Sequence, residues 1–225
     1  MLELTPNLAA RSGRPLLLCL GAHADDLEIG CGATVSQLLR RYPRARVEWV
    51  VLSGRGPRQR EARRAAAAVL RRAGQAHVAV HTFRDGYFPT ERGAIKDLFE
   101  SLKQRIKPDL ILTHAGGDGH QDHRLVHELT WNTFRDHMIL EYEIPKYDGD
   151  LGRPQFFVPL SAAAARAKVA LLLRHFATQR PRRWFTAETF LALMRLRGIE
   201  CNAPGGYAEA FYCRKAVLGL KGTRA

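Results

Sequence analysis

The stretch GAHADDLEIGCG, residues 21–32, places three chemically capable side chains close together. His23 supplies an imidazole, and Asp25 and Asp26 supply two adjacent carboxylates. The apolar run Leu16 to Leu20 comes just before them and is typical of a buried strand. We therefore expect a strand that ends in a loop, and a loop that carries these three residues into a helix.

A second polar cluster, THAGGDGHQDHRLVH, lies much further along the chain at residues 113–127. It contains His120, Asp122 and His123, and it also follows an apolar run, residues 109–114. Open α/β sheets bind ligands beyond the carboxyl ends of their strands, at the point where the strand order reverses. If the first and fourth strands are neighbours at that point, the two clusters meet in space.

Together, the two clusters contain three residues of the types that bind metal ions. His23, Asp26 and His123 offer two imidazoles and one carboxylate. Three protein ligands with a fourth position left for water are typical of catalytic zinc. The same set also binds iron(II), so the residue types alone leave the metal open. We expect one divalent cation per chain, with zinc first and Fe²⁺ or another divalent metal as alternatives.

Three further residues of the clusters suit acid–base chemistry. Asp25 adjoins a ligand and is placed to accept a proton from a water whose pKa the metal lowers. His120 is predicted to face the same cavity, as an acid or as the cation that stabilises an oxyanion. Asp122 is expected to hold the His120 ring by a hydrogen bond.

Each of these residues also has an ordinary structural interpretation. Asp25 would cap the helix that follows it, and Asp118 and Asp122 would cap a helix that begins at 123. We interpret the remaining histidines of interest as structural, namely His77, His81, His127, His137 and His175.

The rest of the chain predicts an α/β fold. Apolar strands alternate with helix-length segments, which indicates a mainly parallel sheet with helices on both faces. The expected strands are 16–20, 47–53, 77–83, 109–114, 139–145, 155–160 and 208–217. The expected helices are 33–43, 58–73, 93–106, 123–135, 162–179 and 187–198.

Length and composition bound the class of protein. The 225 residues suit one domain spanning 1–225, with 1–13 as a flexible N-terminal extension. No apolar run is long enough for a membrane helix, and the N-terminus lacks the apolar core of a signal peptide, so we expect a cytoplasmic protein. The four cysteines show no CxxC spacing and are expected to be reduced.

The net charge of +13 comes mainly from arginine. Residues 55–74, RGPRQREARRAAAAVLRRAG, have the pattern of a helix with a solvated basic face. The chain has no zinc-finger or RNA-recognition motif, so we expect no nucleic-acid partner. An anionic substrate or surface fits the charge equally well.

Two motifs resemble those of a known family. AHADDLEIGCG resembles the AHPDDE-type motif of LmbE-like, PIG-L N-acetylglucosaminyl deacetylases, and GHQDH resembles their HxDH motif. The resemblance covers about residues 14–217. It implies a Rossmann-like, three-layer fold and a mononuclear zinc hydrolase that removes the acetyl group from an N-acetylated amino sugar.

The resemblance also implies residue roles. His23, Asp26 and His123 would bind zinc. Asp25 would be the general base and later the proton donor to the amine. His120 would stabilise the tetrahedral oxyanion, with Asp122 tuning it.

The chain departs from the family pattern in places. Ala24 replaces the usual proline, and Leu27 stands where many members have glutamate. Glu28 comes one place later, and we assign it no metal role. Gly30 and Gly32 would let the loop turn and the next helix pack closely.

The contacts with substrate are less specific. Arg58 or Arg60 would reach substrate hydroxyls or a phosphate. The segment GGYAEAFYCRK is similar to the C-terminal segment of bacterial members, so Tyr207 and Glu209 either line the pocket or serve packing.

The substrate remains open among several N-acetylated sugars: free, lipid-linked, nucleotide-linked or thiol-conjugated N-acetylglucosamine, or an antibiotic precursor. The positive charge mildly favours a phosphate-bearing one. The rival hypothesis is a catalytically inactive protein that binds a metal or a sugar phosphate. Family members often form oligomers, so a homo-oligomer is a further expectation.

Overall fold

The computed structural model describes residues 3–8 and 13–217. Within these residues, seven strands form one sheet with the order β3-β2-β1-β4-β5-β7-β6. Neighbouring strands from β3 to β5 run parallel, whereas β7 is antiparallel to both of its neighbours. The strands are β1 (Leu16–His23), β2 (Arg46–Ser53), β3 (Gln75–Val80), β4 (Leu110–His114), β5 (Ile139–Tyr142), β6 (Phe156–Leu160) and β7 (Tyr207–Tyr212).

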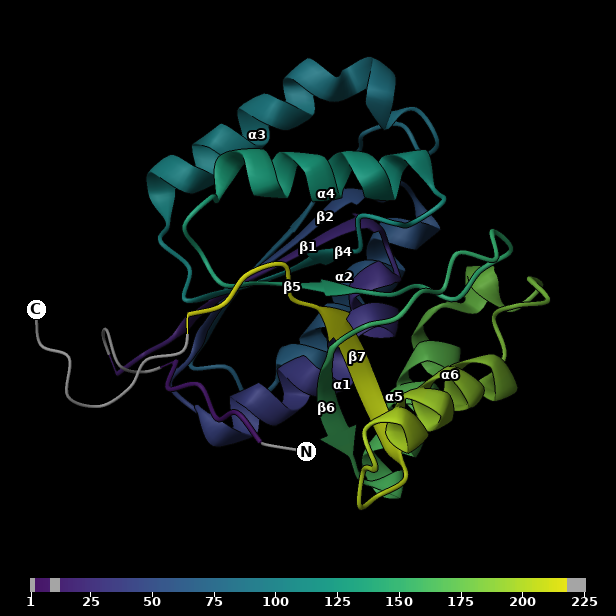
Figure 1. Cartoon of the computed structure of the whole chain (residues 1–225). Coiled ribbons are helices and arrows are strands. Elements are labelled where there is room, and N and C mark those ends of the chain that lie inside the picture. Colours follow the sequence, from purple (N-terminus) through teal and green to yellow (C-terminus); the bar gives the residue numbers. More distant parts are fainter. Residues whose placement is uncertain (1–2, 9–12, 218–225) are drawn as a thin grey trace, which may run out of the picture.

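Helices cover both faces of the sheet and complete three layers. Figure 1 shows α3 and α4 on one face, and α1, α2 and α5 on the other, with α6 beside β7. The helices are α1 (Asp26–Arg41), α2 (Pro57–Leu70), α3 (Arg92–Arg105), α4 (Gln121–Thr133), α5 (Ala162–His175) and α6 (Ala187–Glu200), with the 3-10 turns η1 (Phe88–Glu91) and η2 (Ala177–Gln179). This architecture confirms the predicted α/β class.

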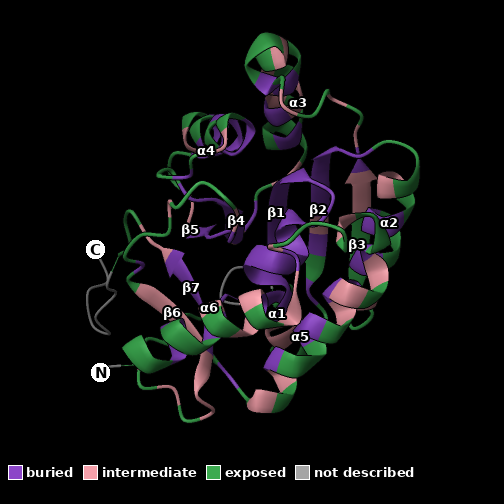
Figure 2. Cartoon of the chain, turned by 90° about the vertical axis from the view of Figure 1, so that its right-hand side faces the viewer, coloured by how far each residue is buried: buried purple, intermediate pink, exposed green. Residues whose placement is uncertain are grey.

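The central strands are apolar because both of their faces are covered. Along β1, Leu17 and Cys19 join the core beneath α1, whereas Leu18 and Leu20 join the core beneath α3 and α4. Figure 2 shows the middle of the sheet as buried throughout. For β1 and its neighbours, the place where several polar side chains can gather around a ligand is therefore the edge where these strands end.

The strand order places two polar clusters at one such edge. β1 pairs with β4 in parallel, from Leu17 opposite Leu110 to Cys19 opposite Leu112. The chain moves from β1 to β2 and β3 in one direction and later to β4 and β5 in the other. β1 and β4 are thus neighbours at the switch in strand order, as predicted.

The structure corrects the predicted loop after β1. Helix α1 begins at Asp26 rather than near residue 33, so Gly30 and Gly32 lie inside a helix and make no turn. A side chain on Gly30 would collide with the ring of Tyr142, so this glycine serves the close packing of α1 on β5. The acidic residues Asp26 and Glu28 favour an early start because carboxylates are stabilised in the first turn of a helix.

Other boundaries shift near the C-terminus. The helix predicted at 162–179 divides into α5 and η2, and the last strand ends at Tyr212 instead of 217. All four cysteines are free thiols, as expected. None of the helices in the described part of the chain has the length and apolarity needed to cross a bilayer.

The segment 1–13, which we expected to be a flexible N-terminal extension, is described only in part. Residues 1–2 and 9–12 lie outside the described residues. Among the others, Leu8 is buried in the core beneath the sheet, and the carbonyl of Pro6 accepts a hydrogen bond from Tyr42 at 3.3 Å. This part of the segment therefore packs against the domain.

Candidate metal and catalytic site

Three potential ligand atoms lie at mutually similar distances at the carboxyl ends of β1 and β4. Nδ1 of His23 is 3.1 Å from Nε2 of His123 and 3.4 Å from Oδ2 of Asp26. Nε2 of His123 is 3.5 Å from the same Asp26 oxygen. A tetrahedral zinc ion with ligand bonds of about 2.0–2.2 Å separates its ligand atoms by about 3.4 Å. The donor set and its spacing therefore fit a small divalent cation.

Three different elements hold these ligand atoms in place. His23 is the last residue of β1, Asp26 is the first of α1, and His123 lies in the first turn of α4. The backbone N–H of His23 donates to Oδ2 of Asp26 at 2.6 Å, which closes the turn between strand and helix. All three residues are buried, so rigid secondary structure rather than a mobile loop carries the site.

Carboxylates fix the orientation of both histidine rings. Nδ1 of His123 contacts Oδ2 of Asp118 at 2.9 Å, which leaves Nε2 facing His23 and Asp26. Nε2 of His23 lies 3.2 Å from Asp122 and 3.1 Å from the exposed Asp85. Histidines that bind metals usually have such a partner on the ring nitrogen that does not face the metal. The sequence had suggested only a helix cap for Asp118.

The contacts of Asp122 correct a prediction. Its carboxylate was expected to hold the ring of His120, but it contacts His23 instead. It also accepts hydrogen bonds from the backbone N–H groups of Gly86, at 2.7 Å, and Phe88, at 3.1 Å. This fully buried carboxylate therefore ties the loop before η1 to the first strand.

His120 receives a different contact from Asp122. Its Nδ1 accepts a hydrogen bond from the backbone N–H of Asp122 at 3.2 Å, so His120 caps the start of α4. The ring lies edge-on to His23, with centroids 4.9 Å apart, and stacks on His123 at 4.7 Å. Burial and the neighbouring imidazoles lower the pKa of His120, which favours its neutral form.

Asp25 pairs with an arginine and not with a helix end. It occupies the cap position of α1 but makes no side-chain capping bond. Its Oδ1 instead lies 2.7 Å from a terminal nitrogen of Arg58, in the first turn of α2. Burial alone would lower the pKa of Arg58, but the charge of Asp25 raises it, so the guanidinium stays charged. Arg60, the other candidate on this helix, is exposed.

The sequence did not single out His114, which ends β4 and is fully buried. Its Nε2 accepts a hydrogen bond from the backbone N–H of Ala22 at 3.0 Å, and its ring stacks on His123 at 3.9 Å. His114, Asp26 and His123 form an alternative group of potential ligands. We favour the group with His23 because the amide of Ala22 already occupies Nε2 of His114.

The surrounding imidazoles control the charge of Asp26. Burial opposes ionisation, but His123, His114 and His23 together lower the pKa of Asp26 well below its usual value. For His23 itself, burial opposes the charged form, but Asp26, Asp122 and Asp85 raise its pKa well above its usual value. Without a cation, the site therefore pairs an ionised Asp26 with a protonated His23, and a bound metal would replace that proton.

Two of the residues considered for substrate contacts lie elsewhere. Glu209 is buried under the middle of α1, where its carboxylate accepts the backbone N–H groups of Ala33, at 3.0 Å, and Thr34, at 2.6 Å. It also pairs with the buried Lys168 at 2.5 Å. Tyr207 packs against the core, with Arg195 over its ring. The packing interpretation is therefore the one that fits both residues.

A cavity of about 400 Å³ meets the site only at Asp118, and none of the three candidate metal ligands lines it. Asp118, which holds His123, forms part of its wall together with Gly116 and Gly117. Opposite them, the cavity is lined by residues of the segment after β5 and by Tyr212. Because Asp118 contacts Nδ1 of His123, the ring nitrogen that faces away from His23 and Asp26, the cavity lies behind His123 and not over the triad.

The chain matches known proteins over most of its length. A model of the PIG-L family, described as GlcNAc-PI de-N-acetylase, matches residues 18–134. The uncharacterized deacetylase YaiS of Escherichia coli K12 is 30% identical over 180 residues, which cover 75% of this chain and 94% of YaiS.

Two solved structures show the same fold at low identity. The N,N'-diacetylchitobiose deacetylase of Pyrococcus horikoshii is 19% identical, with a TM-score of 0.67 over 92% of this chain and 85% of its own. GalB, the 4-carboxy-2-hydroxymuconate hydratase of Pseudomonas putida KT2440, is 17% identical, with a TM-score of 0.73 over 92% of this chain and 98% of its own. The fold thus occurs in both a deacetylase and a hydratase, whereas the family match is with deacetylases. The chain belongs to the PIG-L family of de-N-acetylases.

Proposed function

We propose that this protein is a zinc-dependent hydrolase that removes the acetyl group from an N-acetylated amino sugar. The observation that carries the proposal is the triad of His23, Asp26 and His123 with an independently held carboxylate, Asp25, next to it. The family match supports the deacetylase class. In the reaction, water cleaves the amide bond into acetate and a free amine.

His23, Asp26 and His123 would hold the cation through the three atoms described above. When bound, the cation would supply Lewis acidity, which lowers the pKa of a water and polarises the acyl oxygen. The buried partners of the two histidines, Asp122 and Asp118, keep the correct ring nitrogens directed at the cation.

Asp25 is the candidate for proton transfer. It adjoins Asp26 in the chain but does not share its contacts with the histidines, since its carboxylate turns to Arg58. In our proposal it accepts a proton from the attacking water and later gives that proton to the departing nitrogen. Arg58 holds one carboxylate oxygen and leaves the other available for this exchange.

His120 is placed to stabilise negative charge on the acyl oxygen. Because its Nδ1 accepts the N–H of Asp122, the neutral ring carries its proton on Nε2. A neutral N–H donor in this position would stabilise an oxyanion without the cost of burying another positive charge. We therefore propose that His120 acts as a hydrogen-bond donor rather than as a cation.

The substrate class is an N-acetylglucosamine-type sugar, free or conjugated. The Pyrococcus horikoshii protein that shares this fold is named for an N-acetylated disaccharide. The rival hypothesis, an inactive binding protein, does not explain why Asp25 is held by Arg58 next to the triad.

The test measures metal per chain together with amine release. Wild-type protein and His123→Ala are analysed for metal content and assayed with N-acetylglucosamine and its nucleotide-linked form. We expect about one zinc per chain in the wild type, and loss of both metal and amine release in the variant. His77→Ala, which changes an exposed histidine on β3, is the matched control.

Two other outcomes would argue against the proposed function. Metal without amine release from any N-acetylated sugar would favour a different reaction at the same site. A wild-type protein that binds no divalent metal under any loading condition would contradict the proposal.

A further inference from the structure

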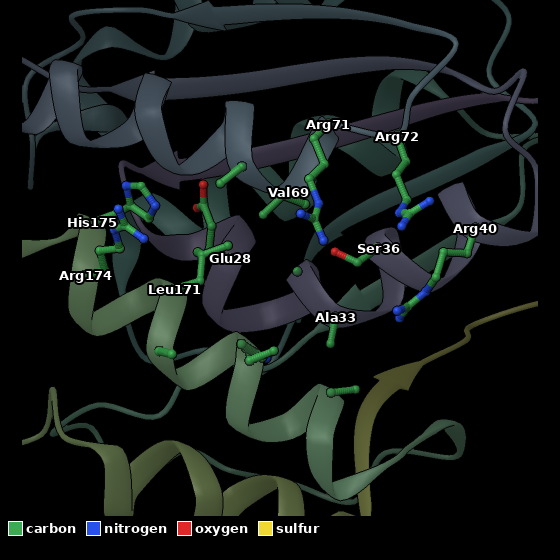
Figure 3. A pocket seen from close by; sticks show the side chains of 16 residues that line it. Glu28, Ala33, Ser36, Arg40, Val69, Arg71, Arg72, Leu171, Arg174 and His175 are labelled. Carbon is green, nitrogen blue, oxygen red and sulfur yellow. The ribbon is translucent and has the colours of Figure 1, made fainter.

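A groove separate from the metal triad lies within the helical layer that contains α1. Helices α1, α2 and α5 enclose a volume of about 450 Å³, with α1 between the other two (Figure 3). Small residues of α1, Gly32, Ala33 and Ser36, form its floor. Outside the groove, the turn after α5 is attached to α2, because the backbone N–H and the hydroxyl of Thr178 both donate hydrogen bonds to Glu61.

Four arginines line this groove without partners. They are Arg40 of α1, Arg71 and Arg72 after α2, and Arg174 of α5. All four are exposed, and within the described part of the chain none forms an ion pair or a side-chain hydrogen bond. Figure 3 shows the side chains of Arg71 and Arg72 extending from α2 toward α1, with Arg71 directed at Ser36.

The other end of the groove carries a buried acid. Glu28 lines it, is only 1% exposed, and neither of its carboxyl oxygens has a hydrogen-bond partner within the described residues. Lys168 also lines the groove, but it pairs with Glu209 and does not neutralise Glu28. In Figure 3, Glu28 lies beside Arg174 and His175, away from the three arginines at the far end.

Helix ends explain only part of this arrangement. Arginines near helix C-termini are stabilised by the helix dipole, and Arg40, Arg71 and Arg72 lie near such ends. The dipole does not explain why guanidinium groups from two helices converge over one hollow with no acid between them. Guanidinium groups match the oxygens of phosphate in geometry and charge.

We propose that this groove binds a small phosphorylated ligand of the nucleoside phosphate class. Phosphate oxygens would contact Arg40, Arg71 and Arg72, and hydroxyl or amino donors at the opposite end of the ligand would pair with Glu28. The volume lies within the range of about 300–1,000 Å³ usual for small-molecule sites. The ligand would bind beside α1 without touching the triad, because His23, Asp26 and His123 do not line the groove.

The test is calorimetric titration of the full chain with ADP and with pyrophosphate. ADP should bind at one site per chain, more tightly than pyrophosphate, because its nucleoside reaches toward Glu28. The double variant Arg71→Ala/Arg72→Ala should weaken ADP binding at least tenfold. Arg166→Ala, an exposed position on α5 outside the groove, should change the affinity by less than twofold.

Two further variants keep the test decisive. Ser36→Phe fills the floor of the groove without changing its charge and should also abolish ADP binding. His123→Ala removes a metal ligand, and ADP binding should persist in it. The proposal is overturned if His123→Ala abolishes binding, if Arg166→Ala weakens it as much as the double variant, or if the protein binds anionic vesicles or DNA but not ADP.

Discussion

Two regions contain residues of helix α1: the candidate metal triad of His23, Asp26 and His123, and the groove that is lined by four arginines. The charged side chains of these two regions are arranged in opposite ways. At the start of α1, Asp26 lies among three histidines, and Asp25 pairs with Arg58. Further along the same helix, Arg40 faces a groove whose arginines have no acidic partner in the described part of the chain. Acidic and basic side chains are thus paired around the triad, whereas the arginines of the groove lack acidic partners among the described residues.

This difference in charge pairing indicates how each region would bind a ligand. Around the triad, buried hydrogen bonds hold every ring in place, so a small cation would find its ligand atoms already positioned. In the groove, the guanidinium groups are exposed and have no partner among residues 3–8 and 13–217, so a bound anion would order them. The first region is suited to chemistry and the second to recognition.

The largest effect is expected when Asp25, the candidate base next to the triad, is replaced. Asp25→Asn should lower kcat for deacetylation by about 10²–10⁴-fold, because proton transfer contributes on that scale. The metal content should be unchanged, since Asp25 is not among the triad atoms. Steady-state kinetics and elemental analysis measure both quantities, with the exposed Asp97→Asn as control. Loss of metal in Asp25→Asn would place this carboxylate among the ligands instead.

A second prediction concerns the buried pair beneath α1. Lys168 donates to the carbonyl of Ile29 and to Glu209, which in turn accepts two backbone N–H groups of α1. Lys168→Met should lower the free energy of unfolding by about 3–5 kcal/mol, because it leaves an uncompensated buried charge.

Urea denaturation measures this change, and Lys103→Met on the exposed face of α3 is the control. Adding Glu209→Gln to Lys168→Met should recover part of the loss, since the amide carries no charge. A change within about 0.5 kcal/mol for Lys168→Met would show that the pair does not stabilise α1.

A smaller effect, on zinc affinity, is expected from Asp118, the carboxylate that orients the ring of His123. Asp118→Asn should weaken zinc binding by about 10- to 100-fold, because carboxylates that orient ligating histidines contribute on that scale. Asp150→Asn is a matched control, since Asp150 shares the partner Lys146 with Asp118 but does not contact His123. Competition with a zinc chelator measures the affinity. Equal weakening in both variants would assign the effect to Lys146.

The smallest effect concerns pH and the groove. Burial, followed by the charges of Arg174 and Arg64, lowers the pKa of His175 below its usual value of 6.5. As the pH falls through 6.5, the unfolded chain gains a proton here that the folded chain does not, so the free energy of unfolding falls.

His175→Gln should therefore reduce the loss of stability between about pH 7 and pH 5. Denaturation curves across this range test it, with His77→Gln as the control. An unchanged slope in His175→Gln would show that neither burial nor the two arginines lowers the pKa of this ring in the folded protein.

Much of the site was predictable from local patterns. The apolar runs before His23 and before His120 indicated strands, and parallel strands present their carboxyl ends at one edge. The structure brings His23, Asp26 and His123 together there as expected. The start of α1 was predicted too late because Gly30 and Gly32 suggested a turn, whereas both lie inside the helix and the small size of Gly30 serves packing against β5.

Contacts between distant side chains were harder to predict. Asp122 was assigned to His120, its neighbour in sequence, yet its carboxylate reaches His23 across the switch point. Glu209 was a candidate for substrate contact but lies beneath α1 with Lys168. Asp118 was predicted only as a helix cap, and His114 gave no signal beyond its nearness to the HxDH motif.

The sequence by itself determined the alternation of strands and helices and the residue types of the candidate triad. The alternation follows from hydrophobic periodicity, which acts over short stretches of chain, and the triad residues were found because two expected strands end in polar clusters. Only the tertiary structure decided that Arg58 holds Asp25, that Asp122 and Asp118 orient the two rings, and that four arginines share a groove. Those pairings depend on how helices pack on the sheet and on which rotamers that packing allows, and no local pattern encodes either.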